Sequence, residues 1–110
     1  MNAVRISGLI AAALLAPAAA FAADVQGNPA AGKGVFAANN CGSCHALKAA
    51  RATGAIASNL DKRKPSYAAV VSVVTNGKTK NGLAMPAYKG TLTPKQIQNL
   101  AAFVYASTHA

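Results

Sequence analysis

Three segments of the chain place apolar residues at the spacing of an α-helix, and the first begins at Asn28-Pro29. Asn favours the N-cap position of a helix, and Pro favours the first helical position. Apolar and small residues then recur at i, i+1, i+4 and i+5 within residues 31–36, which puts them on one helical face. Gly32 within this stretch lowers helix propensity unless another backbone must come close. The pattern predicts a helix that ends near Asn39-Asn40.

The second segment with helical spacing starts at Pro65-Ser66 and stops at Asn76-Gly77. Four valines fall between residues 70 and 74, and such a β-branched run is also compatible with a strand. No other segment reads as a partner strand, so we expect a helix here.

The last helix has the clearest start signal, because Thr93-x-x-Gln96 is a capping box and Pro94 occupies the first helical position. Leu92 before the cap and Ile97 after it fit a hydrophobic staple. The remaining apolar positions predict one buried face with Phe103 at its edge. That face comprises Ile97, Leu100, Ala101 and Val104.

The segments between these helices, 46–64 and 78–90, lack a clear period and are expected to be loops. The chain shows no internal repeat. We therefore expect an all-α fold of three to four helices in one domain, residues 23–110, preceded by a separate leader.

Residues 1–22 have the features of a secretory signal peptide: Arg5, an apolar run too short to span a bilayer, and Ala20-Phe21-Ala22 as a cleavage site. An uncleaved membrane anchor is the alternative. Cleavage would leave a protein without stable membrane insertion, exported to the periplasm, or to the thylakoid lumen in a photosynthetic cell.

The charge balance is strongly basic. Eleven Lys and Arg stand against two Asp, and the leader removes only Arg5, so ten basic residues and a formal charge of +8 remain. Nucleic acid is not an expected partner, because an exported chain rarely meets it and no binding motif is present. The basic side chains are either an ordinary solvated face or a docking surface for redox proteins with acidic surfaces.

Cys41-Gly42-Ser43-Cys44-His45 is the one motif that specifies a chemistry. Cys-x-x-Cys-His is the attachment site of a c-type haem. Each thiol bonds one vinyl group of the porphyrin, and the histidine binds its iron. A redox dithiol would need an α/β pattern that is absent, and a zinc site would need more ligands than the remaining His109 supplies. The motif therefore predicts one haem c, bound covalently through Cys41 and Cys44, with His45 as a ligand.

Met85 is the candidate for the opposite face of the iron. It is the only methionine besides Met1, and it stands before Pro86 in a segment that no helical stripe requires. A lone methionine more often fills a gap in a core. As a ligand, its soft thioether would favour the reduced iron and raise the reduction potential. His109, near the chain end, is expected to be a solvated side chain.

These features resemble the class I c-type cytochromes, most closely the short bacterial and photosynthetic carriers, over residues 28–108. The resemblance implies a small cytochrome c fold around one haem, in which Gly32 and Phe36 meet Leu100 and Phe103. Besides the haem motif, it rests on the segments 74–78, 84–90, 92–93 and 100–104, which read VTNGK, AMPAYKG, LT and LAAFV.

The chain departs from this family after the haem motif. The family has Gly-Pro before Asn-Leu, and the Pro carbonyl accepts the Nδ1 proton of the ligating histidine. Here Ala57-Ser58 precede Asn59-Leu60. The resemblance therefore implies that the Ser58 carbonyl holds His45 in a less rigid loop.

The expected function is single-electron transfer by a periplasmic carrier, not catalysis of a substrate reaction. Two alternatives remain. One is a haem c subunit bound tightly to a periplasmic dehydrogenase, and the other is a haem protein with an open iron site for a ligand.

Overall fold

The computed structural model describes residues 25–110, so the predicted leader lies outside the described residues. Three main helices confirm the three predicted from the sequence: α3 (Pro29–Ala38), α5 (Tyr67–Asn76) and α6 (Pro94–Thr108). Their caps also agree. Asn28, Ser66 and Thr93 each accept a backbone N–H with their side chain, and both hydrogen bonds of the capping box form at α6.

The two segments predicted as loops are more ordered than expected, and that part of the prediction was wrong. Residues 46–64 contain a pair of two-residue strands and a one-turn helix, and residues 78–85 form a hairpin. Elements this short show too few turns or alternations to leave a period in the sequence. They are η2 (Cys41–Ser43), β1 (Ala46–Leu47), η3 (Lys48–Ala50), β2 (Ala52–Thr53), α4 (Leu60–Arg63), β3 (Lys78–Lys80) and β4 (Leu83–Met85).

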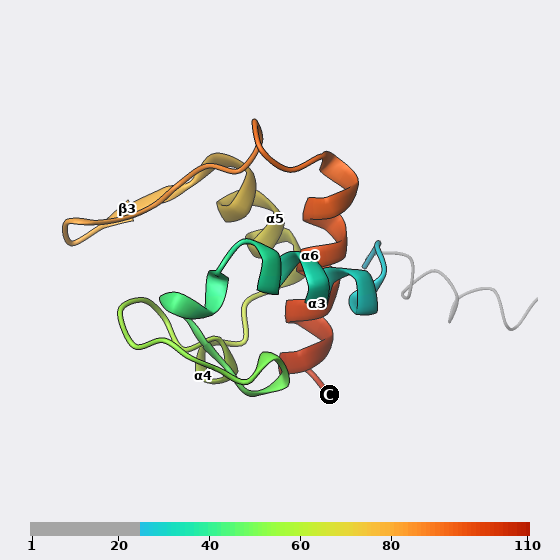
Figure 1. Cartoon of the computed structure of the whole chain (residues 1–110), viewed down its shortest axis with the longest axis horizontal. Helices are drawn as coiled ribbons and strands as arrows, with labels where there is room; N and C mark the ends of the chain where they lie inside the picture. Colours follow the sequence, from blue (N-terminus) through green and yellow to red (C-terminus); the bar gives the residue numbers. More distant parts are fainter. Residues whose placement is uncertain (1–24) are drawn as a thin grey trace, which may run out of the picture.

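Helices α3 and α6 cross in close contact, although they lie at opposite ends of the described chain (Figure 1). The crossing is possible because Gly32 has no side chain. A Cβ there would overlap the carbonyl oxygen of Asn99 and lie 2.8 Å from Phe103 Cβ. Beside it, Phe36 and Phe103 meet edge to face with ring centroids 5.8 Å apart. The predicted contact between the first and last helices is therefore present.

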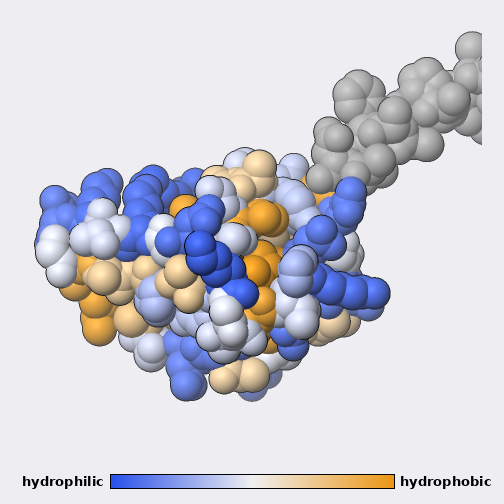
Figure 2. All heavy atoms as spheres, turned by 90° about the horizontal axis from the view of Figure 1, so that it is seen from above, coloured by the Kyte–Doolittle hydropathy of each residue, from blue (hydrophilic) through white to orange (hydrophobic). Residues whose placement is uncertain are grey.

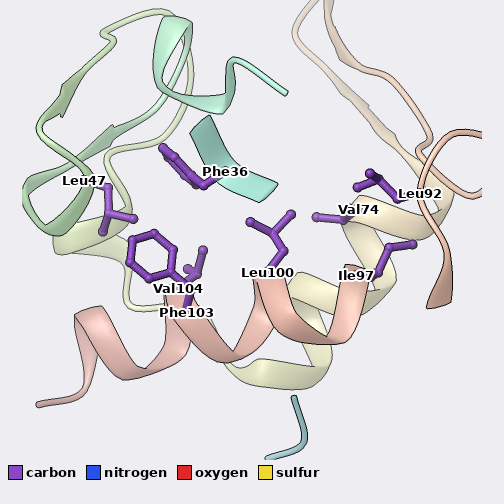
Figure 3. Close-up of a cluster of buried hydrophobic side chains, with 8 residues drawn as sticks. All are labelled: Phe36, Leu47, Val74, Leu92, Ile97, Leu100, Phe103 and Val104. Atoms are coloured by element: carbon purple, nitrogen blue, oxygen red, sulfur yellow. The ribbon is translucent and has the colours of Figure 1, made fainter. Parts of the chain in front are cut away.

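Among the described residues, a hydrophobic core joins the helices with the loop after the haem motif (Figure 3). Leu47 of β1 is fully buried at 0% exposure, which anchors that loop to the helices. Leu92, one residue before the cap of α6, is buried as the staple predicts. The cluster comprises Phe36, Leu47, Val74, Leu92, Ile97, Leu100, Phe103 and Val104.

The hairpin β3–β4 projects from the helical body (Figure 1). Its two-residue turn, Asn81-Gly82, has positive φ at both positions (52° and 81°), which is the type I′ geometry that Asn-Gly favours. Gly77 enters the hairpin at φ 75° and ψ 175°, a region open essentially to glycine alone. The fold remains mostly helical, with the two small sheets as additions.

On the face shown in Figure 2, hydrophilic side chains cover much of the surface, with hydrophobic residues exposed between them. The larger exposed hydrophobic residues are Ile56 at 61% and Leu83 at 52% exposure. Within residues 25–110, no helix combines the length and apolar character needed to cross a membrane.

Candidate functional site

The haem motif forms a tight turn directly after α3. Asn40 reverses the chain in the left-handed region (φ 54°), and η2 follows. The Cys41 carbonyl accepts hydrogen bonds from the N–H groups of Cys44 (3.3 Å) and His45 (3.0 Å). Both cysteines are half-buried and neither forms a disulfide. The turn therefore presents two free thiols and an imidazole from one short stretch of backbone.

Burial raises the pKa of the Cys41 thiol above its ordinary value, and the neighbouring Cys44 raises it further against an opposing backbone hydrogen bond. The thiol is consequently held in its neutral form at neutral pH. Tyr88 has a raised pKa because of burial first, and then because of the charges of Cys41 and Cys44. Tyr88 and Cys41 both pack against the hydrophobic cluster.

The ring of His45 is oriented by the backbone of the following loop. Its Nδ1 lies 2.8 Å from the Ser58 carbonyl oxygen and 3.4 Å from the Ser58 hydroxyl. A carbonyl oxygen can only accept, so Nδ1 carries the proton and donates. In the neutral ring, Nε2 is then the unprotonated nitrogen that can bind a metal. Ser58 thus occupies the position that the family resemblance assigned to it.

The loop that carries Ser58 is fastened to the haem motif by its backbone. Ala57 N–H donates to the Cys44 carbonyl at 2.9 Å. A Cβ on Gly54 would lie 2.5 Å from the Cys44 carbonyl carbon and 2.7 Å from the His45 nitrogen, so only glycine allows this approach. These contacts attach the loop to the backbone of Cys44 and His45.

A hydrogen bond and a β-bridge attach the other end of this loop to the residues that follow the haem motif. Lys48 N–H donates to the Asp61 carboxylate at 2.9 Å, and Ala46 bridges to Asn59 in a parallel pair. Asp61 is the sole acidic side chain within residues 25–110. No role was predicted for Asp61 from the sequence. Its rarity as an acidic residue in a basic chain could have indicated one.

Met85 ends strand β4, where it pairs with Lys78 across the hairpin. It is half-buried and packs against the same hydrophobic cluster as Cys41. A Cβ on Gly77 would lie 2.7 Å from the Met85 carbonyl oxygen, so the glycine fixes how closely the two strands meet at this point. The haem motif and Met85 therefore contact one core from two separate segments.

These groups suit a haem c. Two free thiols three positions apart and an imidazole oriented through Nδ1 are the groups by which a protein holds a haem c. The half-buried thioether of Met85 is a candidate for a second ligand to its iron. The zinc alternative finds no support within the described part of the chain, where no three His, Cys, Asp or Glu side chains gather. His109 lies at the end of α6, stacked on Tyr105 with ring centroids 4.1 Å apart.

Comparison with known proteins agrees with this chemistry. Residues 27–104 match the family model described as cytochrome c oxidase, cbb3-type, subunit III. Cytochrome c6 of Nostoc sp. is 41% identical over 83 residues, covering 72% of this chain and 70% of that protein. Cytochrome c6 of Leptolyngbya boryana is 43% identical over 81 residues, covering 68% of this chain and 87% of that protein.

A solved structure shows the same fold. The c-type cytochrome SorU from Sinorhizobium meliloti matches with a TM-score of 0.62 and 33% identity, over 73% of this chain and 90% of that one. Related cytochromes carry one covalent haem c bound through two cysteines, and Cys41 and Cys44 are the two cysteines of this chain. The cytochrome c6 relatives are electron carriers rather than enzymes. The chain thus belongs to the class I monohaem c-type cytochromes.

Proposed function

We propose that this cytochrome is an exported one-electron carrier in which His45 and Met85 are the two axial ligands of the haem iron. The observation that carries the proposal is the 2.8 Å contact between His45 Nδ1 and the Ser58 carbonyl, which leaves Nε2 free beside two unpaired thiols. The bound haem supplies an iron that alternates between the ferric and ferrous states.

The chain's own residues have separate tasks in this proposal. Cys41 and Cys44 would hold the haem, each by adding its S–H across one vinyl group, which needs no oxidant. The Ser58 carbonyl orients His45 and increases its strength as a ligand. Leu47 is fully buried in the hydrophobic cluster against which Cys41 and Met85 pack, which gives the site an apolar support.

Met85 would complete the coordination with a soft sulfur donor, which raises the reduction potential. Met85→Ala should retain the covalent haem, lower the potential and let added carbon monoxide or imidazole bind the iron. Leu83→Ala is the matched control, because it changes a side chain on the same strand and face, two residues away.

The measurements are the visible and near-infrared spectra and the reduction potential of purified holoprotein. We expect the sulfur-to-iron charge-transfer band in the wild type and in Leu83→Ala, and its loss in Met85→Ala. An unchanged potential in Met85→Ala would disprove the axial assignment. Ready carbon monoxide binding by the wild type would instead favour the open-site alternative.

Export to the periplasm or an equivalent lumen is part of the proposal, on the sequence of residues 1–22. The redox partners would present acidic surfaces to the basic chain, so their association should slow as ionic strength rises. A partner reaction that is independent of salt would remove the electrostatic part of the proposal and leave the haem chemistry intact.

A haem subunit of a larger complex is the second candidate, because the matching family model is described as an oxidase subunit. The haem chemistry would be the same, and only the mobility would differ. Isolation of the native protein from its source distinguishes the two: a free carrier elutes at the size of one chain, whereas a subunit elutes with its larger partners.

A further inference from the structure

The hairpin β3–β4 places four side chains on one face. Directly opposed residues of an antiparallel pair share a face, and so do residues two positions apart along a strand. The register pairs Lys78 with Met85 and Lys80 with Leu83. Lys78, Lys80, Leu83 and Met85 consequently lie on the same face, and the pair formed by Thr79 and Ala84 lies on the other.

This face runs from the site outward into solvent. Met85 at its inner end is half-buried against the core, whereas the residues at 78–84 are all exposed. Leu83 begins β4, two residues before Met85, and hence lies about 7 Å from it toward the tip of the hairpin. It is 52% exposed. A protein that contacts Leu83 and Lys80 is therefore close to the candidate axial ligand.

The hairpin geometry keeps these side chains in position relative to Met85. Three residue pairs and the Asn81-Gly82 turn fix its register, and a slip by one residue would turn the whole set to the opposite face. The chain after the hairpin is tied down as well, because Tyr88 N–H donates to the Val74 carbonyl of α5 at 2.8 Å.

The charge of this surface selects the kind of partner. The hairpin contains two lysines and no acidic residue, and the only carboxylate side chain within residues 25–110, Asp61, accepts a hydrogen bond from Lys48 N–H on another loop. An exposed leucine between cations adds apolar contact area that a purely solvated loop does not need. Both features complement an acidic protein surface with an apolar centre.

We propose that Lys78, Lys80 and Leu83 form the docking face through which this cytochrome exchanges electrons with an acidic redox protein. The proposal rests on the electron-carrier function above and specifies the surface used. In the encounter, the partner loses one electron and the ferric iron gains it. The lysines accelerate association, and Leu83 stabilises the contact once water is displaced.

The test uses the ferric holoprotein and reduced flavodoxin, an acidic one-electron flavoprotein, as the probe in stopped-flow mixing. Lys78→Gln/Lys80→Gln should lower the second-order rate constant about three- to tenfold at low ionic strength. The difference should vanish near 1 M salt, where the Debye length is about 3 Å. Leu83→Ser should lower the rate at both salt concentrations.

Matched controls separate local from global charge. Lys62→Gln/Lys95→Gln removes the same net charge from α4 and α6 and should have a much smaller effect. Reduced riboflavin is a small molecule without a phosphate group and needs no docking face, so its rate should be nearly the same for all variants. If riboflavin fails to reduce the wild type, the carrier function itself is wrong, whatever the hairpin does.

Four outcomes would overturn the docking proposal. One is an equal loss for both lysine pairs, which would mean that net charge alone matters. Another is a larger loss for Lys33→Gln/Arg51→Gln, on the surface beside the haem motif. The third is an equal loss with riboflavin as the reductant, which would assign the effect of the hairpin lysines to the redox properties of the holoprotein rather than to docking. The fourth is loss of binding to phosphatidylglycerol vesicles with an unchanged flavodoxin rate.

Discussion

Replacing Gly32 by alanine tests whether the crossing of α3 and α6 determines the stability of the domain. The new methyl group would overlap the carbonyl oxygen of Asn99 and lie 2.8 Å from Phe103 Cβ. The first of these is a backbone atom, which cannot rotate away as a flexible side chain can. The helices must separate, and the edge-to-face contact between Phe36 and Phe103 loosens with them.

Two opposing effects determine how much stability Gly32→Ala loses. Overpacking in a close-packed core costs about 1–3 kcal/mol, and contact with backbone places this site at about 3 kcal/mol. Alanine offsets about 1 kcal/mol through its higher helix propensity. The net loss for Gly32→Ala is therefore about 2 kcal/mol. Gly34, on the same helix, has no atom within 4 Å of its hypothetical Cβ, so Gly34→Ala should gain about 1 kcal/mol.

Thermal and guanidinium unfolding of the two holoproteins measures this difference. About 3 kcal/mol separates the variants, which corresponds to a gap in Tm of roughly 12–24 °C for a domain of this size. The comparison holds helix propensity constant, because both substitutions are glycine to alanine within α3. If Gly32→Ala unfolds at the same temperature as Gly34→Ala, the close approach of the two helices does not limit stability.

Two further substitutions test the N-cap of α6 and the glycine that precedes the hairpin. Thr93→Ala removes the side-chain oxygen that accepts Gln96 N–H at 3.1 Å, and should cost about 1 kcal/mol of stability. A Tm equal to that of the exposed control Thr91→Ala would contradict this. Gly77→Ala places a side chain at φ 75° and 2.7 Å from the Met85 carbonyl, and should destabilise by about 1–3 kcal/mol. It should also weaken the sulfur-to-iron band by displacing Met85, and a spectrum unchanged from wild type would refute that link.

The main helices could be predicted because their start signals are local. Asn28, Ser66 and Thr93 cap their helices through side-chain contacts that span at most three residues. The valine run could be assigned to a helix only because no partner strand was apparent. The close approach at Gly32 was expected from the family resemblance, since a mid-helix glycine alone does not reveal which backbone comes near.

The hairpin escaped prediction although its signal was present. Asn81-Gly82 is the strongest short-range indication of a two-residue hairpin, but the flanking strands hold only three residues each and include two lysines. Helix α4 was missed for the same reason of length. Within the site, the Ser58 contact was anticipated, whereas the support from Gly54 and Asp61 depends on how the loop folds back.

The closure between the two ends of the domain has a consequence for truncation. Asn28 N–H donates to Asn99 Oδ1 at 2.8 Å across 71 positions, and Gly27 rests against the backbone of the same turn. The haem motif and Met85 both lie inside the loop that this closure defines. The two halves of the chain are therefore not separable units. A polypeptide that stops before Asn99 lacks the part of α6 against which α3 packs.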